Sequence, residues 1–310
     1  MRNLDILKFV NDGGKNRILF DEFETKRWPY YLILPVTWLL VIWMVIKKKI
    51  NASLSRKQEV GLLIFDGIGK YGKVIKRNVT GWKAVDLIYN HRFGENPSIG
   101  GWLDDFWFDS LNCQAARNRF KLVKKELEKA ILGFSDQKEV RIISLAAGTG
   151  QIESETIAKV KKRGINVKVA LIDREYGALK RAQEFISING VQEEIRTINS
   201  DVTYAIDIAK YFRPHIVKMI AFLDYLFEKE AIRFISNIYQ ILPTNGFFIV
   251  SNTLPNVEMY FVKWVVGWPL IYRKPKEITN IIKKSGFIQY EIINEPLHIQ
   301  SIVVARKLNG

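Results

Sequence analysis

The segment 144–151, SLAAGTGQ, is the stretch whose residue types and spacing most directly suggest chemistry. It follows the apolar run 140–143, VRII, which is typical of a buried strand. Glycine lets the main chain approach a ligand closely and adopt angles that other residues avoid. A strand that leads into a Gly-x-Gly turn therefore predicts a ligand over the backbone of Gly148 and Gly150.

Position 153 argues against a dinucleotide as that ligand. The dinucleotide motif Gly-x-Gly-x-x-Gly, begun at Gly148, requires glycine at 153, where this chain has Glu153. The start of a helix attracts a pyrophosphate, and a carboxylate in the first turn would repel it. The turn therefore favours a ligand without a pyrophosphate.

Acidic residues follow three further apolar runs. Asp173 lies 23 residues beyond Gly150, where a carboxylate can accept hydrogen bonds from both hydroxyls of a ribose, although an exposed turn aspartate would look the same. Asp201 follows IRTINS, and Asp224 follows HIVKMIAFL; either could instead cap the next helix. Parallel strands end at one edge of a sheet, so we expect the three carboxylates at the rim where open α/β sheets bind ligands.

A long amphipathic helix is expected at 108–132, ahead of the glycine turn. Apolar residues recur there at three- and four-residue steps and form one stripe: Ala116, Phe120, Val123, Leu127 and Ile131. Two polar residues, Asn112 and Arg119, lie beside that stripe. A polar residue next to a buried face is either a satisfied structural bridge or a contact to a site, and the sequence leaves both interpretations open.

Strands alternate with helices after Gly133. The expected strands are 140–146, 167–173, 195–201, 215–223 and 246–252. Helices between them predict a parallel sheet that is covered on both faces. The last two apolar runs, 287–294 and 298–307, are too close together for a crossover helix, so they should form an antiparallel hairpin.

Five parallel strands closed by an antiparallel hairpin, together with the turn at 148–150 and the acids Asp173 and Asp201, resemble the class I S-adenosylmethionine-dependent methyltransferases. The resemblance implies an α/β fold with a Rossmann-like, seven-stranded, mostly parallel sheet and a C-terminal antiparallel hairpin, preceded here by an N-terminal hydrophobic helix. A closer resemblance, over roughly 101–307, is to a poorly characterised branch of these enzymes and rests on NCQAARNR, FLDYL and WPLIYRKP.

The resemblance implies S-adenosylmethionine as the cofactor, which has no phosphate and is not opposed by Glu153. In the family, the first strand ends in an acid before Gly-x-Gly-x-Gly, and the matching positions here are Ser144, Ala146, Gly148 and Gly150. Alanine at the first glycine costs little if its backbone angles are ordinary. The family's acid helps to hold the amino group of the cofactor. Ser144 carries no charge, so the cationic end of the cofactor needs another partner.

Cofactor contacts are expected from the glycine turn and from the ends of the next three strands. These residues are Ala146, Gly148, Thr149, Gly150, Asp173, Arg174, Asp201, Val202 and Phe222. Acceptor contacts are expected from Asp224, Tyr225 and Arg273. A base is needed only when the acceptor must lose a proton; Asp224 and Tyr225 are candidates, but no catalytic residue is identified. The aromatic segment 259–272 should either wall an acceptor pocket or only cover the sheet.

The run 30–46 contains no charge and is 17 residues long, at the lower limit for a bilayer-spanning helix. Aromatic residues at one end and lysines at the other are what membrane interfaces favour. We expect a membrane anchor at 28–46; a buried core helix or an apolar lid over the active site is the alternative. The expected organisation is an N-terminal segment at 1–27, this anchor, a basic connector at 47–100 and a methyltransferase domain at 101–310.

The 310-residue chain carries a net charge of +15. Nine basic residues and two acids lie between positions 47 and 77, directly after the apolar run. Such an excess of positive charge predicts a negatively charged partner. Its position next to the apolar run favours an anionic membrane surface over nucleic acid. The three histidines and the single cysteine show no metal-ligand spacing, so we expect no metal.

The sequence therefore predicts a membrane-associated, S-adenosylmethionine-dependent methyltransferase with its catalytic domain in the cytoplasm and a small-molecule or lipid acceptor. Methylation of RNA or protein would use the same cofactor and explain the charge. The chain has no recognisable RNA-binding appendage, however, so nucleic acid is not an expected partner. A third alternative is a non-catalytic membrane adaptor whose cofactor site has degenerated at Ser144 and Ala146.

Overall fold

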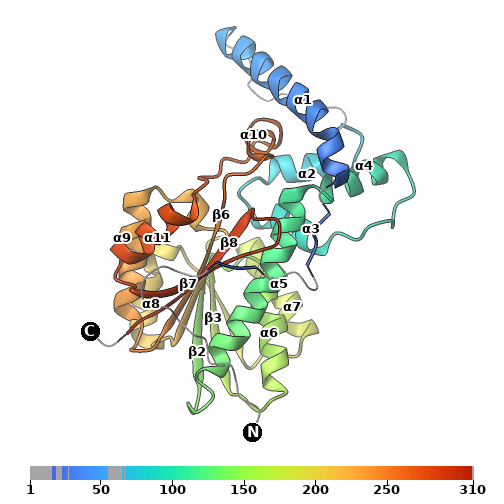
Figure 1. Cartoon of the computed structure of the whole chain (residues 1–310). Helices are drawn as coiled ribbons and strands as arrows, with labels where there is room; N and C mark the ends of the chain where they lie inside the picture. The colour runs from blue at the N-terminus through green and yellow to red at the C-terminus, as the bar shows by residue number, and fades with distance from the viewer. Residues whose placement is uncertain (1–15, 19–22, 27, 55–64, 66, 309–310) are drawn as a thin grey trace.

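Eight strands form one mixed sheet in the computed structural model, which describes residues 16–18, 23–26, 28–54, 65 and 67–308 (Figure 1). The strands are β1 (Asn16–Ile18), β2 (Val140–Leu145), β3 (Val167–Asp173), β4 (Ile195–Asn199), β5 (Ile216–Met219), β6 (Phe247–Thr253), β7 (Gln289–Asn294) and β8 (Gln300–Arg306). Their order across the sheet is β1-β7-β8-β6-β5-β2-β3-β4. The central strands are buried along nearly their whole length, because both faces of the sheet are covered.

The directions of the strands confirm the predicted topology. β2 pairs in parallel with β3 and β5, β3 with β4, and β5 with β6. β8 lies between β6 and β7 and is antiparallel to both, which is the predicted hairpin. The predicted α/β fold with a seven-stranded, mostly parallel sheet is therefore confirmed. The short β1 adds one more strand at the edge, parallel to β7; three residues carry too little pattern to be predicted.

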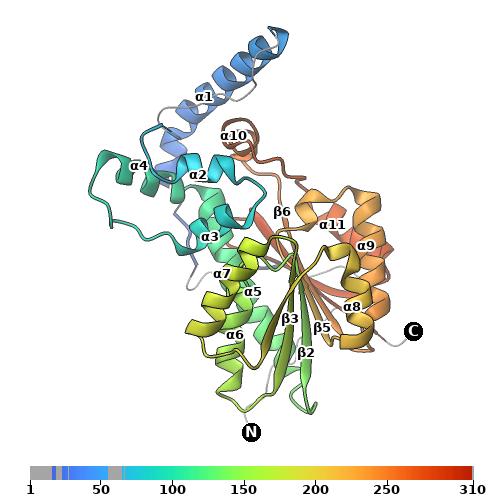
Figure 2. The same cartoon turned by 180° about the vertical axis from the view of Figure 1, so that it is seen from behind.

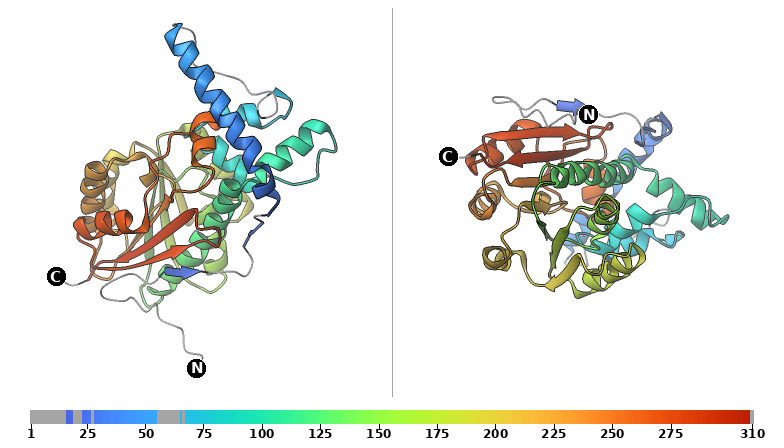
Figure 3. Two further views of the ribbon diagram at one scale, coloured as in Figure 1. Left: turned by 45° about the horizontal axis from the view of Figure 1, so that its top comes forward. Right: turned by 90° about the horizontal axis from the view of Figure 1, so that it is seen from below.

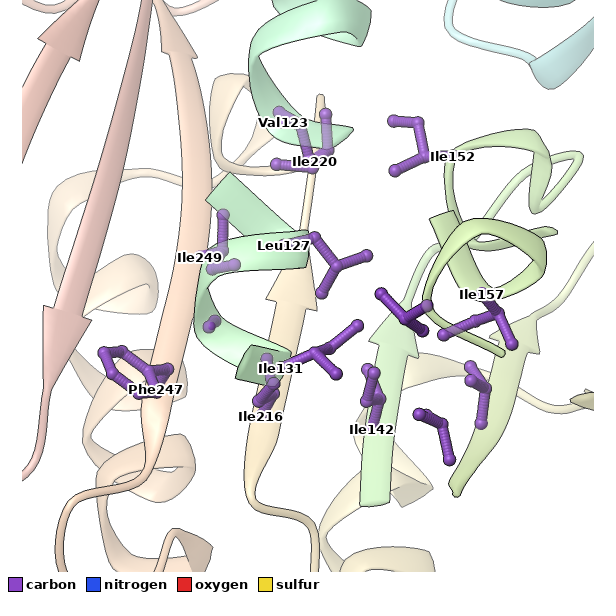
Figure 4. Packing of buried hydrophobic residues seen from close by; sticks show 14 of the residues in the cluster. Val123, Leu127, Ile131, Ile142, Ile152, Ile157, Ile216, Ile220, Phe247 and Ile249 are labelled. Carbon is purple, nitrogen blue, oxygen red and sulfur yellow. The ribbon is translucent and has the colours of Figure 1, made fainter. Parts of the chain in front are cut away.

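Helices cover both faces of the sheet (Figures 1, 2 and 3). One face carries α5 (Leu111–Leu132), α6 (Gln151–Lys161) and α7 (Tyr176–Ile188), and the other carries α8 (Ala205–Phe212), α9 (Glu228–Ile241) and α11 (Pro275–Lys284). The first face packs around Leu127 and Ile131 of α5 and Ile142 of β2 (Figure 4). These contacts confirm that the stripe predicted for the long helix faces the core.

A helical cap stands over the carboxyl ends of the parallel strands (Figures 1 and 2). Its elements are α1 (Trp28–Ser53), α2 (Gly72–Arg77), α3 (Trp82–Asn90), α4 (Ile99–Phe108), α10 (Met259–Phe261) and the π-helical turn η4 (Val262–Val266). Buried side chains such as Met44, Trp107 and Val265 give the cap an apolar core of its own. Two short turns, η2 (Val202–Tyr204) and η3 (Leu223–Tyr225), follow β4 and β5.

Helix α1 projects from the body of the protein while one of its faces packs on the other elements of the cap (Figures 1 and 3). Val41 and Met44 are buried on that face, and Lys48 Nζ donates a hydrogen bond to the carbonyl of Trp264 at 2.8 Å. Within the described residues, no helix has both the length and the apolar character needed to cross a membrane. The bilayer-spanning helix predicted at 28–46 is therefore not supported: α1 continues through Lys47, Lys48 and Lys49 and packs one of its faces on the protein.

Candidate active site

The loop after β2 has the backbone angles that a ligand-binding glycine turn requires. Gly148 and Gly150 have φ of 58° and 57°, in the left-handed region. A Cβ on Gly148 would meet open space, whereas a Cβ on Gly150 would overlap the Leu171 side chain. Ala146 has φ of 47°, so the condition under which this alanine would cost little, ordinary backbone angles, is not met. A non-glycine residue in this region costs on the order of 1–2 kcal/mol, and such strain clusters at functional sites.

A cleft of about 1200 Å³ lies between this loop and the cap. Its walls come from the loops after β2, β3, β4 and β5 and from cap residues between 77 and 89. All the residues predicted to contact the cofactor line this one cleft: Ala146, Gly148, Thr149, Gly150, Asp173, Arg174, Asp201, Val202 and Phe222. Small-molecule sites typically measure about 300–1,000 Å³, so a nucleoside with an amino-acid tail fits this space.

Asp173, at the end of β3, holds the glycine turn and keeps capacity for a ligand. Its Oδ2 accepts a hydrogen bond from the amide of Gly148 and its Oδ1 from the amide of Glu175, both at 2.8 Å. Burial raises the pKa of Asp173, while the two hydrogen bonds act in the opposite direction. A carboxylate has about four lone-pair sites, so two remain for the hydroxyls of a ribose.

Asp201 caps a turn and lines the cleft at the same time. Its Oδ1 accepts a hydrogen bond from the amide of Thr203 at 2.9 Å, at the start of η2. That hydrogen bond lowers the pKa of Asp201. The cap occupies one oxygen, so the two alternatives predicted for this residue, a cap and a ligand contact, are compatible.

A buried ion pair in the wall of the cleft was not predicted from the sequence. Lys218 Nζ, on β5, lies 2.6 Å from Oε1 of Glu153, in the first turn of α6, and both residues line the cleft. Their side chains are 3% and 0% exposed. The sequence signal was a lysine inside the apolar run HIVKMI, but nothing in the local pattern pairs it with Glu153. From the sequence alone, Glu153 indicates only that a pyrophosphate is disfavoured at this turn.

A second, mostly apolar cavity of about 100 Å³ adjoins the cleft. The two spaces share Val85, Ala221 and Tyr225 in their linings. Aromatic and aliphatic side chains of the cap form most of its walls, among them Phe65, Ile88, Trp107, Phe261, Val266 and Trp268. The segment 259–272 supplies Phe261, Val266 and Trp268, so it lies against the cavity.

Asp224 and Tyr225, predicted to contact the acceptor, both line this second cavity. Asp224 is buried, and its Oδ1 accepts a hydrogen bond from the amide of Thr253 at 2.6 Å, so it bridges to β6 instead of capping α9. Burial raises the pKa of Asp224 and raises that of Tyr225 to about 12. The Tyr225 hydroxyl accepts a hydrogen bond from Trp268 Nε1 at 2.7 Å.

Arg119 lines the second cavity, whereas Arg273 lines neither of the two spaces. The sequence left open whether Arg119 is a structural bridge or a contact to a site. Its guanidinium donates to Gln300 Oε1 at 3.1 Å and to the Tyr89 hydroxyl at 2.9 Å. Its Nε has no hydrogen-bond partner in the described part of the chain. Arg273 was predicted to contact the acceptor. It is buried, and its guanidinium donates to the carbonyl of Leu223 at 2.8 Å.

The arrangement places a nucleoside-sized cleft beside a small apolar cavity. Within the described ranges, no group of three or more metal-binding side chains comes together. Two adjoining sites hold two reactants close together, and that proximity alone accelerates a transfer between them. The geometry therefore suits transfer of a group from a bound nucleoside to a second, apolar molecule.

Comparison with known proteins agrees with this geometry. A family model described as "Putative methyltransferase" matches residues 66–307. No relative was found among the curated proteins. A solved structure of a "possible exported protein" from Bordetella parapertussis is similar with a TM-score of 0.67 at 12% identity, over 88% of this chain and 97% of that one. Magnesium protoporphyrin IX methyltransferase from Synechocystis PCC 6803, with bound SAH, has a TM-score of 0.52 at 14% identity, over 76% and 98%.

Likeness at these identities shows a shared fold, while the family match covers most of the chain. The glycine turn, the free lone pairs of Asp173 and the volume of the cleft fit S-adenosylmethionine. The chain therefore belongs to this methyltransferase family and is an S-adenosylmethionine-dependent methyltransferase.

Proposed function

We propose that this methyltransferase acts on a small-molecule or lipid acceptor whose reacting end enters the second cavity. The observation that carries the proposal is that this apolar cavity adjoins the cofactor cleft at Val85, Ala221 and Tyr225. Aromatic and aliphatic walls favour an apolar acceptor, with a few polar groups to orient it. A volume of about 100 Å³ holds only the reacting end, so a larger acceptor requires the cap to move.

The polar groups of the cavity suit an acceptor hydroxyl. The bound cofactor supplies a methyl group on an activated sulfonium, so positioning of the acceptor supplies much of the rate. The Asp224 carboxylate can take the proton of the hydroxyl, and its raised pKa brings it closer to neutral pH, as a general base requires. Arg119 Nε can donate a hydrogen bond to the acceptor. The apolar walls keep water away from the reacting atoms.

Transfer of a labelled methyl group tests this proposal. Wild-type protein receives S-adenosylmethionine with a labelled methyl group together with separated fractions of lipid, small molecules, RNA and protein. We expect label in the lipid or small-molecule fraction, and much less label with Asp224→Asn, because that variant lacks the proposed base. Label confined to RNA or protein would overturn the proposal in favour of the macromolecular alternative.

We further propose that the enzyme works at a membrane surface on which α1 lies. Leu39, Trp43, Ile46 and Ile50 recur at three- and four-residue steps along α1 and are all exposed. This spacing places them on one face of the helix, opposite its buried residues. An exposed apolar stripe on a projecting helix is unfavourable in water and is stabilised by insertion into the boundary of a bilayer.

Basic residues accompany this stripe. Lys47, Lys48 and Lys49 lie on α1 between Ile46 and Ile50 of the stripe. Burial, together with the nearby charge of Lys76, lowers the pKa of Lys48. Lysines next to an apolar stripe attract anionic lipid headgroups. Placement of the catalytic domain on the cytoplasmic side of the membrane stays a prediction.

Cosedimentation with vesicles of phosphatidylcholine and phosphatidylserine tests whether α1 binds a membrane surface. The double variant Ile46→Asn/Ile50→Asn should weaken cosedimentation by about tenfold or more, because it removes two inserted side chains. Ile188→Asn/Ile288→Asn changes the same residue type at two exposed positions outside α1 and should bind like wild type. Equal binding by both double variants would overturn the proposal.

A further inference from the structure

The cofactor cleft lacks the acid that the family places at the end of the first central strand. Ser144 stands there, fully buried, and its Oγ has no hydrogen-bond partner among the described residues. The amino group at the methionine end of the cofactor is a cation, and a hydroxyl offers it no opposite charge. In the register of β2 with β5, Ser144 is paired with Lys218, a second cation. The ammonium group therefore needs an acid from elsewhere in the cleft.

Lys218 forms an ion pair with such an acid, Glu153, on helix α6. Its Nζ lies 2.6 Å from Oε1 of Glu153, in the first turn of α6, where the helix dipole stabilises a negative charge. Both residues line the cleft. Oε2 of Glu153 has no hydrogen-bond partner in the described part of the chain. A buried carboxylate oxygen with spare acceptor capacity thus lies at the wall of the cofactor site.

Stability alone is a poor explanation for this ion pair. Removing two charges from water often costs more than their attraction returns, and an apolar pair of similar volume is often as stable. Lys218 lies in a strand whose other residues, Ile216, Val217 and Met219, are apolar and buried. Paired charges at the wall of a ligand cleft can instead bind a ligand that carries complementary charges.

We propose that Glu153 and Lys218 bind the amino-acid end of S-adenosylmethionine. Glu153 accepts hydrogen bonds from the ammonium group and Lys218 donates to the carboxylate, so the zwitterion meets a pair of opposite charges. Each side chain can serve its partner and the ligand together, because an ammonium has three donors and a carboxylate about four acceptor sites. The acid missing at Ser144 is replaced from the start of the next helix. The inference rests on the cofactor assignment. It adds two cofactor-binding residues that the sequence motif does not mark.

Two compounds distinguish binding of the amino-acid end of the cofactor from binding of its nucleoside end. S-adenosylhomocysteine carries both ends, whereas 5′-methylthioadenosine keeps the nucleoside and the sulfur and lacks the ammonium and carboxylate groups. Glu153→Gln should weaken binding of S-adenosylhomocysteine by at least about tenfold and that of 5′-methylthioadenosine by less than about threefold, since only the first ligand loses a charge-assisted hydrogen bond. Isothermal titration calorimetry measures both dissociation constants on the same protein.

Glu155→Gln is the matched control, because Glu155 lies on the same helix, pairs with Lys124 and does not line the cleft. It should leave both dissociation constants unchanged. The double variant Glu153→Gln/Lys218→Met leaves no buried charge without its partner and should show the same selective loss. Binding of 5′-methylthioadenosine reports an intact cleft in every variant.

Two results would overturn the inference: equal weakening of both ligands in Glu153→Gln, or no change in either. Failure of the wild-type protein to bind both ligands has a different meaning, since it would overturn the cofactor assignment on which the inference rests.

Discussion

Replacement of Asp173 tests the cofactor site most directly. Asp173→Asn keeps the size of the side chain and removes its charge. The carboxylate accepts backbone hydrogen bonds from Gly148 and Glu175 and, in our proposal, hydrogen bonds from both ribose hydroxyls. Hydrogen bonds to charged groups contribute about 1.5–3 kcal/mol each. Loss of two at the lower value is about 3 kcal/mol, or roughly a 100-fold weaker Kd for S-adenosylhomocysteine.

The same residue gives the affinity a pH dependence. Burial raises the pKa of Asp173 above the ordinary aspartate value of about 3.9. Ribose hydroxyls donate to the ionised carboxylate, so cofactor binding favours the ionised form and lowers this pKa again. Affinity is therefore full above the pKa of the free protein and falls as the pH decreases through it. Glu153 and Asp201 also line the cleft, so the difference between wild type and Asp173→Asn isolates this group.

Isothermal titration calorimetry with S-adenosylhomocysteine at several pH values measures both effects. Asp207→Asn is the control, because Asp207 is an exposed residue of α8 that pairs with Lys210 and does not line the cleft. Its Kd and pH dependence should match the wild type. An unchanged Kd in Asp173→Asn, or the same pH dependence as in wild type, would refute the assignment of this carboxylate to the ribose.

The remaining predictions concern the glycine turn and the second cavity. Ala146→Gly removes a left-handed alanine and should raise stability by about 1 kcal/mol, roughly 2 °C in Tm; a lower Tm would contradict the strain. Gly148→Ala should weaken cofactor binding. It should lower Tm less than Gly150→Ala does, because only the methyl group at position 150 overlaps the Leu171 side chain. Equal losses of Tm would contradict this close contact between Gly150 and Leu171. Asp224→Asn should lower kcat by about 100-fold with cofactor Kd unchanged, and wild-type kcat should fall as the pH decreases through the raised pKa of Asp224. A wild-type kcat that does not vary with pH in the acid range would count against a base at this position.

Local patterns in the sequence were enough to specify the sheet and one half of the site. The apolar runs of β2 to β6 and the short link between β7 and β8 predict strand number and direction, because burial and chain length act over a few residues. Gly148 and Asp173 could be located for the same reason, since each directly follows or ends a strand. All the residues predicted for the cofactor line one cleft because parallel strands end at one edge.

The remaining features of the site, and the surface on which α1 packs, were decided only by the tertiary structure. Three features depend on residues distant in the chain: the backbone angle of Ala146, the position of Arg273 outside the linings of both cavities, and the pairing of Lys218 with Glu153. An apolar run at 30–46 is equally compatible with a bilayer and with packing on a cap, because both remove apolar surface from water. Only the assembled neighbours decide which surface is buried and which charges meet, because those contacts are made between elements and leave no periodic pattern within any one of them.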